Sequence, residues 1–329
     1  MVRFGIIGTN FITERLLDHI KGYSEFSLAA IYSRTEERAS EFARQYGVET
    51  TFTNLEDMAN SPEVDAVYIA SPNALHSKQS IMMMEHGKHV LCEKPLASNE
   101  KEAAAMIKAA QENDVVLMEA MKTTLLPSFT NMTNYLPKIG KIRRYCANYC
   151  KYSSRYDAYR DGKNVNTFNP KFSNGSLMDL GVYCLYPMVV WFGEPDSIKA
   201  NGVKLASGVD GEGSLVASYE ERGMEAVITH SKISDSFTHS EIQGEDGSIL
   251  IDNISDPTHI ELKYRDGNIE LIHELEKPSM FYEVQEFIER IKTGEHQSTL
   301  NSHKHSLITM RILDEARAQM GVEYPADSE

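Results

Sequence analysis

The feature that most constrains the fold is a change of pattern near residue 121. Before that point, short β-rich runs alternate with helical patterns, an alternation typical of a parallel α/β sheet. After it, longer β-rich runs follow one another with tight breaks. A chain of 329 residues is long enough to bury two hydrophobic cores. We therefore predict two domains, at 1–121 and 122–329.

The first domain is predicted to be a doubly wound parallel sheet of the α/β class. Its best strands are nearly all apolar, as strands covered on both faces must be. The helix expected at 35–47 has clear ends, because Thr35 suits an N-cap and Gly47 suits the position after the last turn. Strands are expected at 4–8, 28–33, 50–52, 64–70, 89–93 and 115–119, and a second helix at 99–113.

The second domain is predicted to be of the α+β type with a mainly antiparallel sheet. The turns at 221–223, 245–247 and 266–268 are so short that antiparallel pairing is the only economical geometry. Strands are expected at 142–150, 197–203, 214–219, 224–231, 239–243, 248–251, 260–264 and 269–273, and helices at 175–192, 281–292 and 302–320.

Charge and composition exclude several kinds of partner. The net charge is −15 and the pI near 5.2, which opposes attraction to phosphate backbones and anionic lipids, so neither nucleic acid nor a membrane is expected as a partner. The four cysteines show no CxxC spacing and no companion histidines, so no metal site is expected and the thiols are taken as reduced. Without a leader pattern at the N-terminus, the expected location is the cytoplasm.

The junction after the first strand is a candidate dinucleotide site. Its glycine turn runs into an apolar helix, and in a Rossmann unit such a turn aims backbone N–H groups at a pyrophosphate. The G-x-G-x-x-G fingerprint is imperfect, because Asn10 and Thr13 replace the second and third glycines. Asn tolerates a left-handed backbone and Thr is small enough for fairly close packing. The expected cofactor contacts here are Gly8, Thr9, Asn10, Phe11 and Ile12, with a plain structural turn as the alternative.

The tip of the second strand indicates which dinucleotide binds. An NAD enzyme would usually carry an acid here for the ribose 2′-hydroxyl, but this chain has Ser33, Arg34 and Thr35. A guanidinium can hold a 2′-phosphate, and the two hydroxyls add donors. A solvated surface arginine is the alternative. The position of Arg34 favours NADP as the cofactor over NAD.

Two further segments follow the fourth and fifth strands, at the sheet edge where such folds bind ligands. They are Ser71-Pro72-Asn73-Ala74-Leu75-His76 and Glu93-Lys94-Pro95. With the glycine turn and the segment Gly175-Ser176-Leu177-Met178-Asp179-Leu180-Gly181-Val182-Tyr183, they occur in the order and spacing of a known family. The chain resembles the glucose-fructose oxidoreductase, inositol dehydrogenase and rhizopine-catabolism (Gfo/Idh/MocA) family over essentially its whole length.

The resemblance implies a Rossmann domain, a domain with a large open sheet, and a hydride-transfer site between them. Lys94 would hold the reacting oxygen and stabilise its negative charge. Tyr183, where many relatives have His, would act as acid or base, as in the xylose and dihydrodiol dehydrogenase branch. Asp179, four residues before it, would share its helix face. Ser71, Asn73, His76 and Glu93 would contact the cofactor, although His76 could equally be a surface or cap residue, and Tyr183 a core residue.

The resulting function is an NADP-dependent oxidoreductase of a sugar, a polyol or a related small carbohydrate-like molecule. A non-catalytic dinucleotide sensor, or an oxidoreductase of a dihydrodiol, an imine or a tetrapyrrole, stays open. Lys122-Thr123-Thr124 departs from the aromatic-Thr-Arg run of the dihydrodiol and xylose enzymes, which puts the substrate contacts in doubt. Too few helices follow the second sheet to cover both its faces, so the chain is expected to form a homodimer or homotetramer through that sheet.

Overall fold

The computed structural model describes residues 1–272 and 277–328. The chain divides into two compact units. The first unit contains residues 1–120 and 277–306, and the second contains residues 121–276 and 307–329. The sequence had placed residues 277–306 with the second domain, whereas their packing groups them with the first unit.

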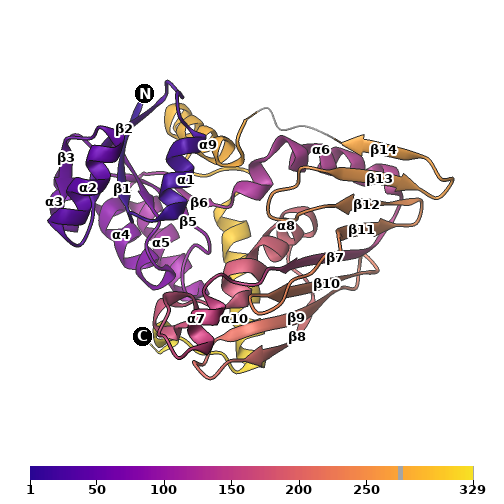
Figure 1. Ribbon diagram of the computed structural model, residues 1–329. Coiled ribbons are helices and arrows are strands. Elements are labelled where there is room, and N and C mark those ends of the chain that lie inside the picture. Colours follow the sequence, from indigo (N-terminus) through magenta and orange to yellow (C-terminus); the bar gives the residue numbers. More distant parts are fainter. Residues whose placement is uncertain (273–276, 329) are drawn as a thin grey trace. The chain divides into compact units, whose positions relative to one another are not determined.

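In the described residues, the first unit has a six-stranded, fully parallel sheet with the strand order β3-β2-β1-β4-β5-β6 (Figure 1). The order reverses between β1 and β4, as in doubly wound dinucleotide-binding sheets. The predicted fold class is confirmed. The strands are β1 (Val2–Ile7), β2 (Phe26–Tyr32), β3 (Thr50–Phe52), β4 (Ala66–Ile69), β5 (His89–Glu93) and β6 (Leu117–Ala120).

The helices of the first unit are α1 (Phe11–His19), α2 (Glu36–Tyr46), α3 (Leu55–Asn60), α4 (His76–Glu85), α5 (Glu100–Glu112) and α9 (Ser279–Thr293). Their ends follow local chemistry. The Thr35 hydroxyl caps α2 by accepting a hydrogen bond from the Arg38 N–H, and Gly47 ends the helix with a left-handed backbone at φ 71°. Both ends of α2 were predicted from sequence.

In the described residues, the second unit has an eight-stranded sheet with the order β14-β13-β12-β11-β7-β10-β9-β8. Only β7 and β10 pair in parallel, and the three predicted hairpins are confirmed. The strands are β7 (Ile142–Cys150), β8 (Ser197–Lys204), β9 (Asp210–Tyr219), β10 (Met224–Ser231), β11 (Ser240–Gly244), β12 (Gly247–Ile251), β13 (Ile260–Tyr264) and β14 (Ile269–Ile272). β9 begins four residues before the predicted strand. His273, expected at the end of the last strand, lies outside the described residues.

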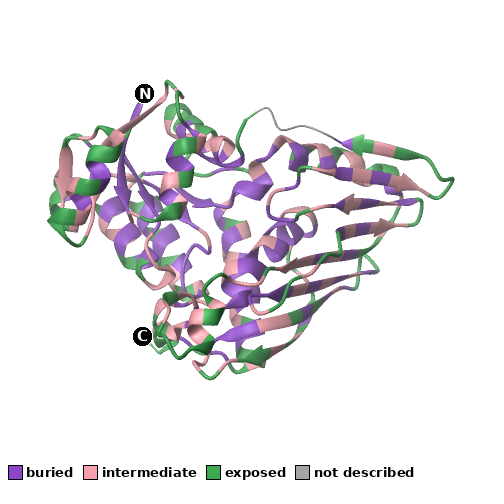
Figure 2. Ribbon diagram, viewed as in Figure 1, coloured by how far each residue is buried: buried purple, intermediate pink, exposed green. Residues whose placement is uncertain are grey.

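In the part of the chain that the structure describes, helices pack on one face of this sheet and not on the other. Residues along β10 alternate between buried and half-buried, and Figure 2 shows the same alternation in neighbouring strands. The uncovered face carries Val216, Ile269 and Leu271, which are 39%, 57% and 54% exposed. The helices of this unit are α6 (Pro127–Tyr135), α7 (Tyr156–Arg160), α8 (Val182–Phe192) and most of α10 (His303–Met320).

The segment before α8 is a π-helix, Leu177–Gly181, and not the continuous α-helix expected from sequence. A π turn closes hydrogen bonds one residue further apart than an α turn and is frequent at functional sites. Among the described residues, the helical stretch 170–192 is long and apolar enough to cross a membrane by length and composition alone. Most of it is buried inside the protein, as a core helix would be.

Candidate active site

The glycine turn after β1 has the geometry of a phosphate cradle. Gly8 has φ +113°, and a Cβ there would lie 2.5 Å from the Ala70 carbonyl oxygen, so only glycine fits. The Thr13 hydroxyl, fully buried, donates to the Gly8 carbonyl at 2.6 Å. The turn is thus held against the tip of β4 and leads directly into the N-terminus of α1. A pyrophosphate fits this arrangement.

Asn10 does not have the backbone conformation that its position in the G-x-G-x-x-G fingerprint indicates. Its backbone is extended (φ −124°, ψ 178°) and not left-handed, so that interpretation was wrong. The side chain caps α1 by accepting from the N–H groups of Ile12 and Thr13, and it donates to the Ala70 carbonyl at 2.6 Å. Where the fingerprint has a second glycine with a flexible backbone, this chain has an asparagine whose side-chain hydrogen bonds stabilise the turn. Phe11 is 75% exposed beside it.

The tip of β2 carries a second arginine that the sequence analysis missed. Arg34 is exposed, and the Ser33 N–H donates to the Phe52 carbonyl oxygen at 3.1 Å. One helical turn further on, the Arg38 guanidinium contacts Thr9, with Nε 3.2 Å from its hydroxyl and Nη2 2.9 Å from its carbonyl oxygen. The position of Arg38 in the first turn of α2, next to the tip of β2, could have indicated that it reaches the glycine turn.

His76 joins the loops that follow β4 and β5. It is fully buried, and its ring nitrogens lie 2.9 Å from the Ser71 carbonyl oxygen and 3.0 Å from the Pro95 carbonyl oxygen. Burial lowers the pKa of His76, against the two carbonyls that raise it. His76 therefore holds the two loops together, and it is not a surface residue. Asn73 is the first residue of a short 3₁₀ turn, Asn73–Leu75, which lies in the chain between Ser71 and His76.

The loop that carries Lys94 is also anchored by two buried carboxyl groups. Glu93 accepts a hydrogen bond from the Tyr68 hydroxyl at 2.5 Å. Glu119, at the end of β6, accepts from the Leu96 N–H at 3.0 Å and from the Ser306 hydroxyl at 2.6 Å. Burial, the largest cause, raises the pKa of Glu119 to about 7 with a smaller contribution from the nearby Glu93, although these two hydrogen bonds lower it. The backbone on both sides of Lys94 is thus fixed.

Tyr183 and Asp179 belong to the second unit and are both partly exposed. The Tyr183 ring lies edge-on to Tyr149, with the centroids 5.6 Å apart. The Asp179 carboxylate accepts a hydrogen bond from the buried Lys232 ammonium at 2.5 Å. Lys94 belongs to the first unit, so its meeting with Tyr183 in one site stays a prediction.

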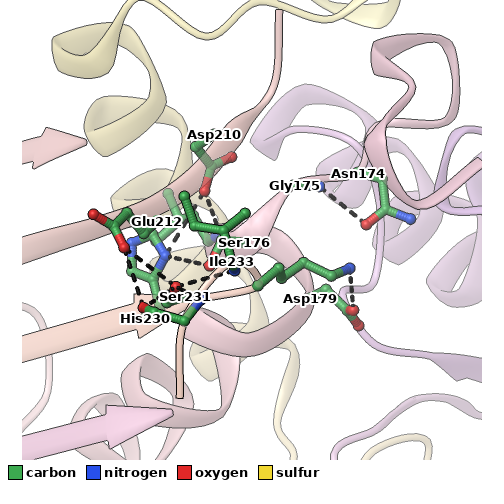
Figure 3. Close-up of polar contacts among 12 residues, drawn as sticks. Asn174, Gly175, Ser176, Asp179, Asp210, Glu212, His230, Ser231 and Ile233 are labelled. Carbon is green, nitrogen blue, oxygen red and sulfur yellow. Dashed lines mark hydrogen bonds and ion pairs between the residues drawn. The ribbon is translucent and has the colours of Figure 1, made fainter. Parts of the chain in front are cut away.

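A buried polar group supports the helix that carries both residues (Figure 3). The Asp210 carboxylate accepts from the Leu177 N–H at 2.6 Å and so caps the helix from β9. A Cβ on Gly175 would lie 2.1 Å from Asp210 Oδ1, which explains the glycine at this position. Next to it, His230 Nδ1 and the Ser176 hydroxyl are hydrogen-bonded at 2.9 Å. Burial raises the pKa of Asp210 to about 6 and lowers that of His230 to about 3.

The departure at Lys122 has a structural explanation. Its ammonium is buried, donates to the Ser255 carbonyl oxygen at 2.7 Å and lies 3.1 Å from Asp256. The Thr123 hydroxyl donates to the same carbonyl at 2.8 Å. This run therefore fastens a loop of the second unit. Within the described residues, no group of three or more His, Cys, Asp or Glu side chains could hold a metal ion.

A 3-2-1-4-5-6 parallel sheet with a glycine cradle at the end of β1 defines a dinucleotide-binding Rossmann unit. Residues 2–121 match the family model described as "Oxidoreductase family, NAD-binding Rossmann fold", and residues 137–250 match the Gfo/Idh/MocA C-terminal domain. The chain belongs to the Gfo/Idh/MocA oxidoreductase family, and the resemblance found in the sequence is confirmed. It is an enzyme of the NAD(P)-dependent class that acts on hydroxyl-bearing carbons.

Several known proteins are similar to this chain over at least nine tenths of its length. The scyllo-inositol 2-dehydrogenase (NADP(+)) IolU of Bacillus subtilis is 56% identical over 99% of both chains, and the uncharacterised oxidoreductase YgjR of Escherichia coli is 46% identical over 100% of this chain and 99% of its own. A trans-1,2-dihydrobenzene-1,2-diol dehydrogenase of Danio rerio is 30% identical over 93% and 92%. The aldose-aldose oxidoreductase of Caulobacter crescentus shares the fold, with a TM-score of 0.85 at 21% identity over 97% of each chain.

Proposed function

We propose that this protein is an NADP-dependent dehydrogenase of a cyclic polyol, with scyllo-inositol as the first candidate substrate. The observation that carries the proposal is the 56% identity, over 99% of both chains, with an NADP-dependent scyllo-inositol 2-dehydrogenase. The anchored Lys94 loop and the partly exposed pair Asp179 and Tyr183 supply the side chains that oxidation of a hydroxyl group requires.

The preference for NADP is supported by charge at the tip of β2. Arg34 is exposed beside the glycine turn, and Arg38 contacts the Thr9 carbonyl oxygen directly. No acid stands at 33–35 to repel a 2′-phosphate. Two guanidinium groups next to the turn favour a cofactor that carries this additional phosphate.

In the proposed reaction, a nicotinamide cofactor held at the glycine turn would supply hydride transfer, and the protein's own side chains stabilise the charge and move the proton. The Lys94 ammonium holds the reacting oxygen and stabilises its negative charge. The Tyr183 hydroxyl exchanges the hydroxyl proton, which is possible because an adjacent ammonium favours the phenolate. Asp179 binds a neighbouring hydroxyl of the substrate. Residues 1–121 would bind the cofactor, and 122–329 would supply substrate contacts and assembly.

The test is an assay of the purified protein with NADP⁺, in which the formation of NADPH is measured by its absorbance. The substrates compared are scyllo-inositol, other inositols, aldoses and a trans-dihydrodiol. Turnover of a cyclic polyol with NADP⁺ is expected, and Tyr183→Phe serves as the control for contaminating activity. The dihydrodiol is included because dihydrodiol dehydrogenases are 27% to 30% identical to this chain. Preference for the dihydrodiol would replace the proposed substrate. Cofactor binding without turnover of any compound would favour the dinucleotide sensor.

The proposal includes two properties of the whole protein. The uncovered face of the second sheet, with Val216, Ile269 and Leu271 exposed on it, favours a homodimer or homotetramer built through that face. The proposed location is the cytoplasm. No nucleic acid and no membrane are proposed as partners, because the chain carries a net charge of −15.

A further inference from the structure

Lys232 is a buried lysine to which the proposed reaction gives no role. It follows the last residue of β10, and its side chain is only 5% exposed. Its backbone is held on both sides, because its N–H donates to the Gly211 carbonyl oxygen at 2.8 Å and its own carbonyl accepts from the Ser153 N–H at 2.9 Å. The ammonium donates to Asp179 at 2.5 Å, the contact drawn beside Asp179 in Figure 3.

The Lys232 ammonium lies close to two acidic side chains. Asp179 lies on one side of it, and the negative charge of the buried Asp210 interacts favourably with its ammonium. His230 adds no positive charge near neutral pH, since burial lowers its pKa to about 3. The ammonium also lies 5.7 Å from the centre of the Phe168 ring, whose face attracts a cation. A neutral side chain at position 232 would leave the carboxyl groups of Asp179 and Asp210 without a nearby positive charge.

The two ends of the ion pair differ in exposure. The Asp179 side chain is 37% exposed, whereas the Lys232 side chain is 5% exposed. The pair thus has its cation inside the protein and its carboxylate at the surface, where a ligand can reach it. Asp179 also lies in the π-helix, only four residues before Tyr183, and both side chains are partly exposed.

We propose that Lys232 is a positioning residue that keeps the Asp179 carboxylate ionised and turned outward to accept a hydrogen bond from a substrate hydroxyl. This role rests on the proposed function, since it needs a substrate with a second hydroxyl beside the reacting one. The competing interpretation is a purely structural pair that fastens the π-helix to the end of β10. The two interpretations differ in what happens to substrate binding and to the pH profile.

The experiment is a double-mutant cycle of Lys232→Met and Asp179→Asn, with steady-state kinetics on the polyol that the unmodified enzyme oxidises. Each single variant should raise KM for the polyol roughly 10- to 100-fold, the usual effect of losing a hydrogen bond to a charged group. The double variant should be no worse than Asp179→Asn alone, because Lys232 acts through Asp179. Lys101→Met, which removes an exposed lysine in α5, is the control for the loss of one positive charge. The affinity for NADPH and the thermal midpoint are measured for every variant as controls for general damage to the protein.

The pH profile separates positioning from mere structural support. In Lys232→Met the acid limb of kcat/KM should move to higher pH, since the carboxylate has lost the ammonium that favours its ionised form. Asp210, whose charge interacts with Lys232, and the titratable residues next in the chain to this pair, His230 and Tyr183, are unchanged in this variant. Lys232→Arg, which keeps the charge, should restore the acid limb. If Lys232→Met fails to fold, the KM for the polyol and the acid limb of kcat/KM are measured in Lys232→Arg and Asp179→Asn instead.

Three results would overturn the role of Lys232. The first is an unchanged KM and an unchanged acid limb of the pH profile in Lys232→Met. The second is additivity of the two single effects on KM in the double variant. The third is a rise in KM that is fully accounted for by the loss of thermal stability in Lys232→Met. These results leave the proposed function intact if the unmodified enzyme oxidises the polyol. Absence of any polyol turnover by the unmodified enzyme would overturn the proposed function and this role together.

Discussion

Glu119 Oε1 lies 3.0 Å from the backbone nitrogen of Leu96, so a buried carboxyl group at the end of β6 holds the loop that carries Lys94. The other carboxyl oxygen accepts from the Ser306 hydroxyl at 2.6 Å. The Lys94 loop is therefore tied to the start of α10, which lies more than two hundred residues away in sequence and is packed with the first unit.

This carboxyl group predicts how stability depends on pH. The folded pKa of Glu119 is raised to about 7 from the ordinary 4.5, so the folded state binds more protons than the unfolded state between these values. The contribution of Glu119 to stability is then greatest at low pH and is lost as pH rises from about 4.5 to 7. Glu119→Gln mimics the protonated carboxyl, since its amide can donate to Ser306 while its oxygen accepts from Leu96.

We expect Glu119→Gln to remove that dependence and to be more stable than the unmodified protein at pH 8, by no more than about 3 kcal/mol. Urea unfolding at pH 5 and pH 8 measures this, with Glu85→Gln, an exposed carboxyl in α4, as the control. Parallel pH dependences of the unmodified protein and Glu119→Gln would show that Glu119 does not titrate in this range.

Tyr183→Phe keeps the ring and its contact with Tyr149 and loses only the hydroxyl. If the hydroxyl transfers the proton, kcat should fall by about 10²- to 10⁴-fold, with thermal midpoint and NADPH affinity near the unmodified values. Lys94→Ala should also lose turnover without losing stability. Steady-state kinetics and cofactor titration separate these effects, and near-normal turnover of Tyr183→Phe would remove Tyr183 from the mechanism.

The two arginines near the glycine turn should affect cofactor binding differently. Arg34→Asp should reverse the preference from NADPH to NADH, because an acid repels the 2′-phosphate and suits a free ribose hydroxyl. Arg38→Ala loses two hydrogen bonds to Thr9 and should weaken both cofactors. Fluorescence titration with NADPH and NADH measures both. Equal affinities of the unmodified protein for the two cofactors would contradict the assignment to NADP.

Gly175→Ala should destabilise the second unit strongly. Its Cβ would lie 2.1 Å from Asp210 Oδ1, and the carboxylate cannot move without leaving the Leu177 N–H uncapped. We expect a loss of about 2–4 kcal/mol. Gly87→Ala is the matched control, since Gly87 also has a positive φ, of +74°, but a Cβ there meets nothing within 4 Å, so this variant carries the backbone strain without the contact. Chemical denaturation of both variants measures the difference, and similar losses would mean that the approach of Asp210 is not the cause.

Val216→Glu should dissociate the proposed dimer or tetramer. Val216 is 39% exposed on the uncovered sheet face, where a buried charge at an interface would lack a partner. Light scattering at micromolar concentration is expected to give an oligomer for the unmodified protein and a monomer for the variant. A monomer mass for the unmodified protein would disprove assembly through this face.

Local chemistry made much of the fold predictable. The apolar runs of β4 and β5 reflect burial on both faces, and Thr35 and Gly47 mark the ends of α2 because capping depends on neighbouring residues alone. Short turns such as 221–223 determine antiparallel pairing for the same reason. The strand tips that carry Ser71 and Glu93 followed from the rule that parallel strands end at one edge.

Long-range contacts were decided by the tertiary structure. Residues 277–306 pack with the first unit, and no local pattern indicates that Ser306 meets Glu119 or that Met280 donates to His19. Asn10 was misread because its place in the fingerprint indicates a backbone conformation, while its side chain finds the Ala70 carbonyl sixty residues away. The π-helix is in contact with Asp210 and His230, which belong to strands more than thirty residues further along the chain.

The sequence by itself determined the family, the parallel and antiparallel sheets, and the residue types of the candidate site, since those follow from periodicity, turn length and short motifs. Only the tertiary structure decided which side chains support them: Arg38 against Thr9, Glu119 against Leu96, and Lys232 against Asp179. The physical reason is that helix and strand patterns depend on neighbours a few residues apart, whereas a buried charge is stable only where the whole fold supplies its partner.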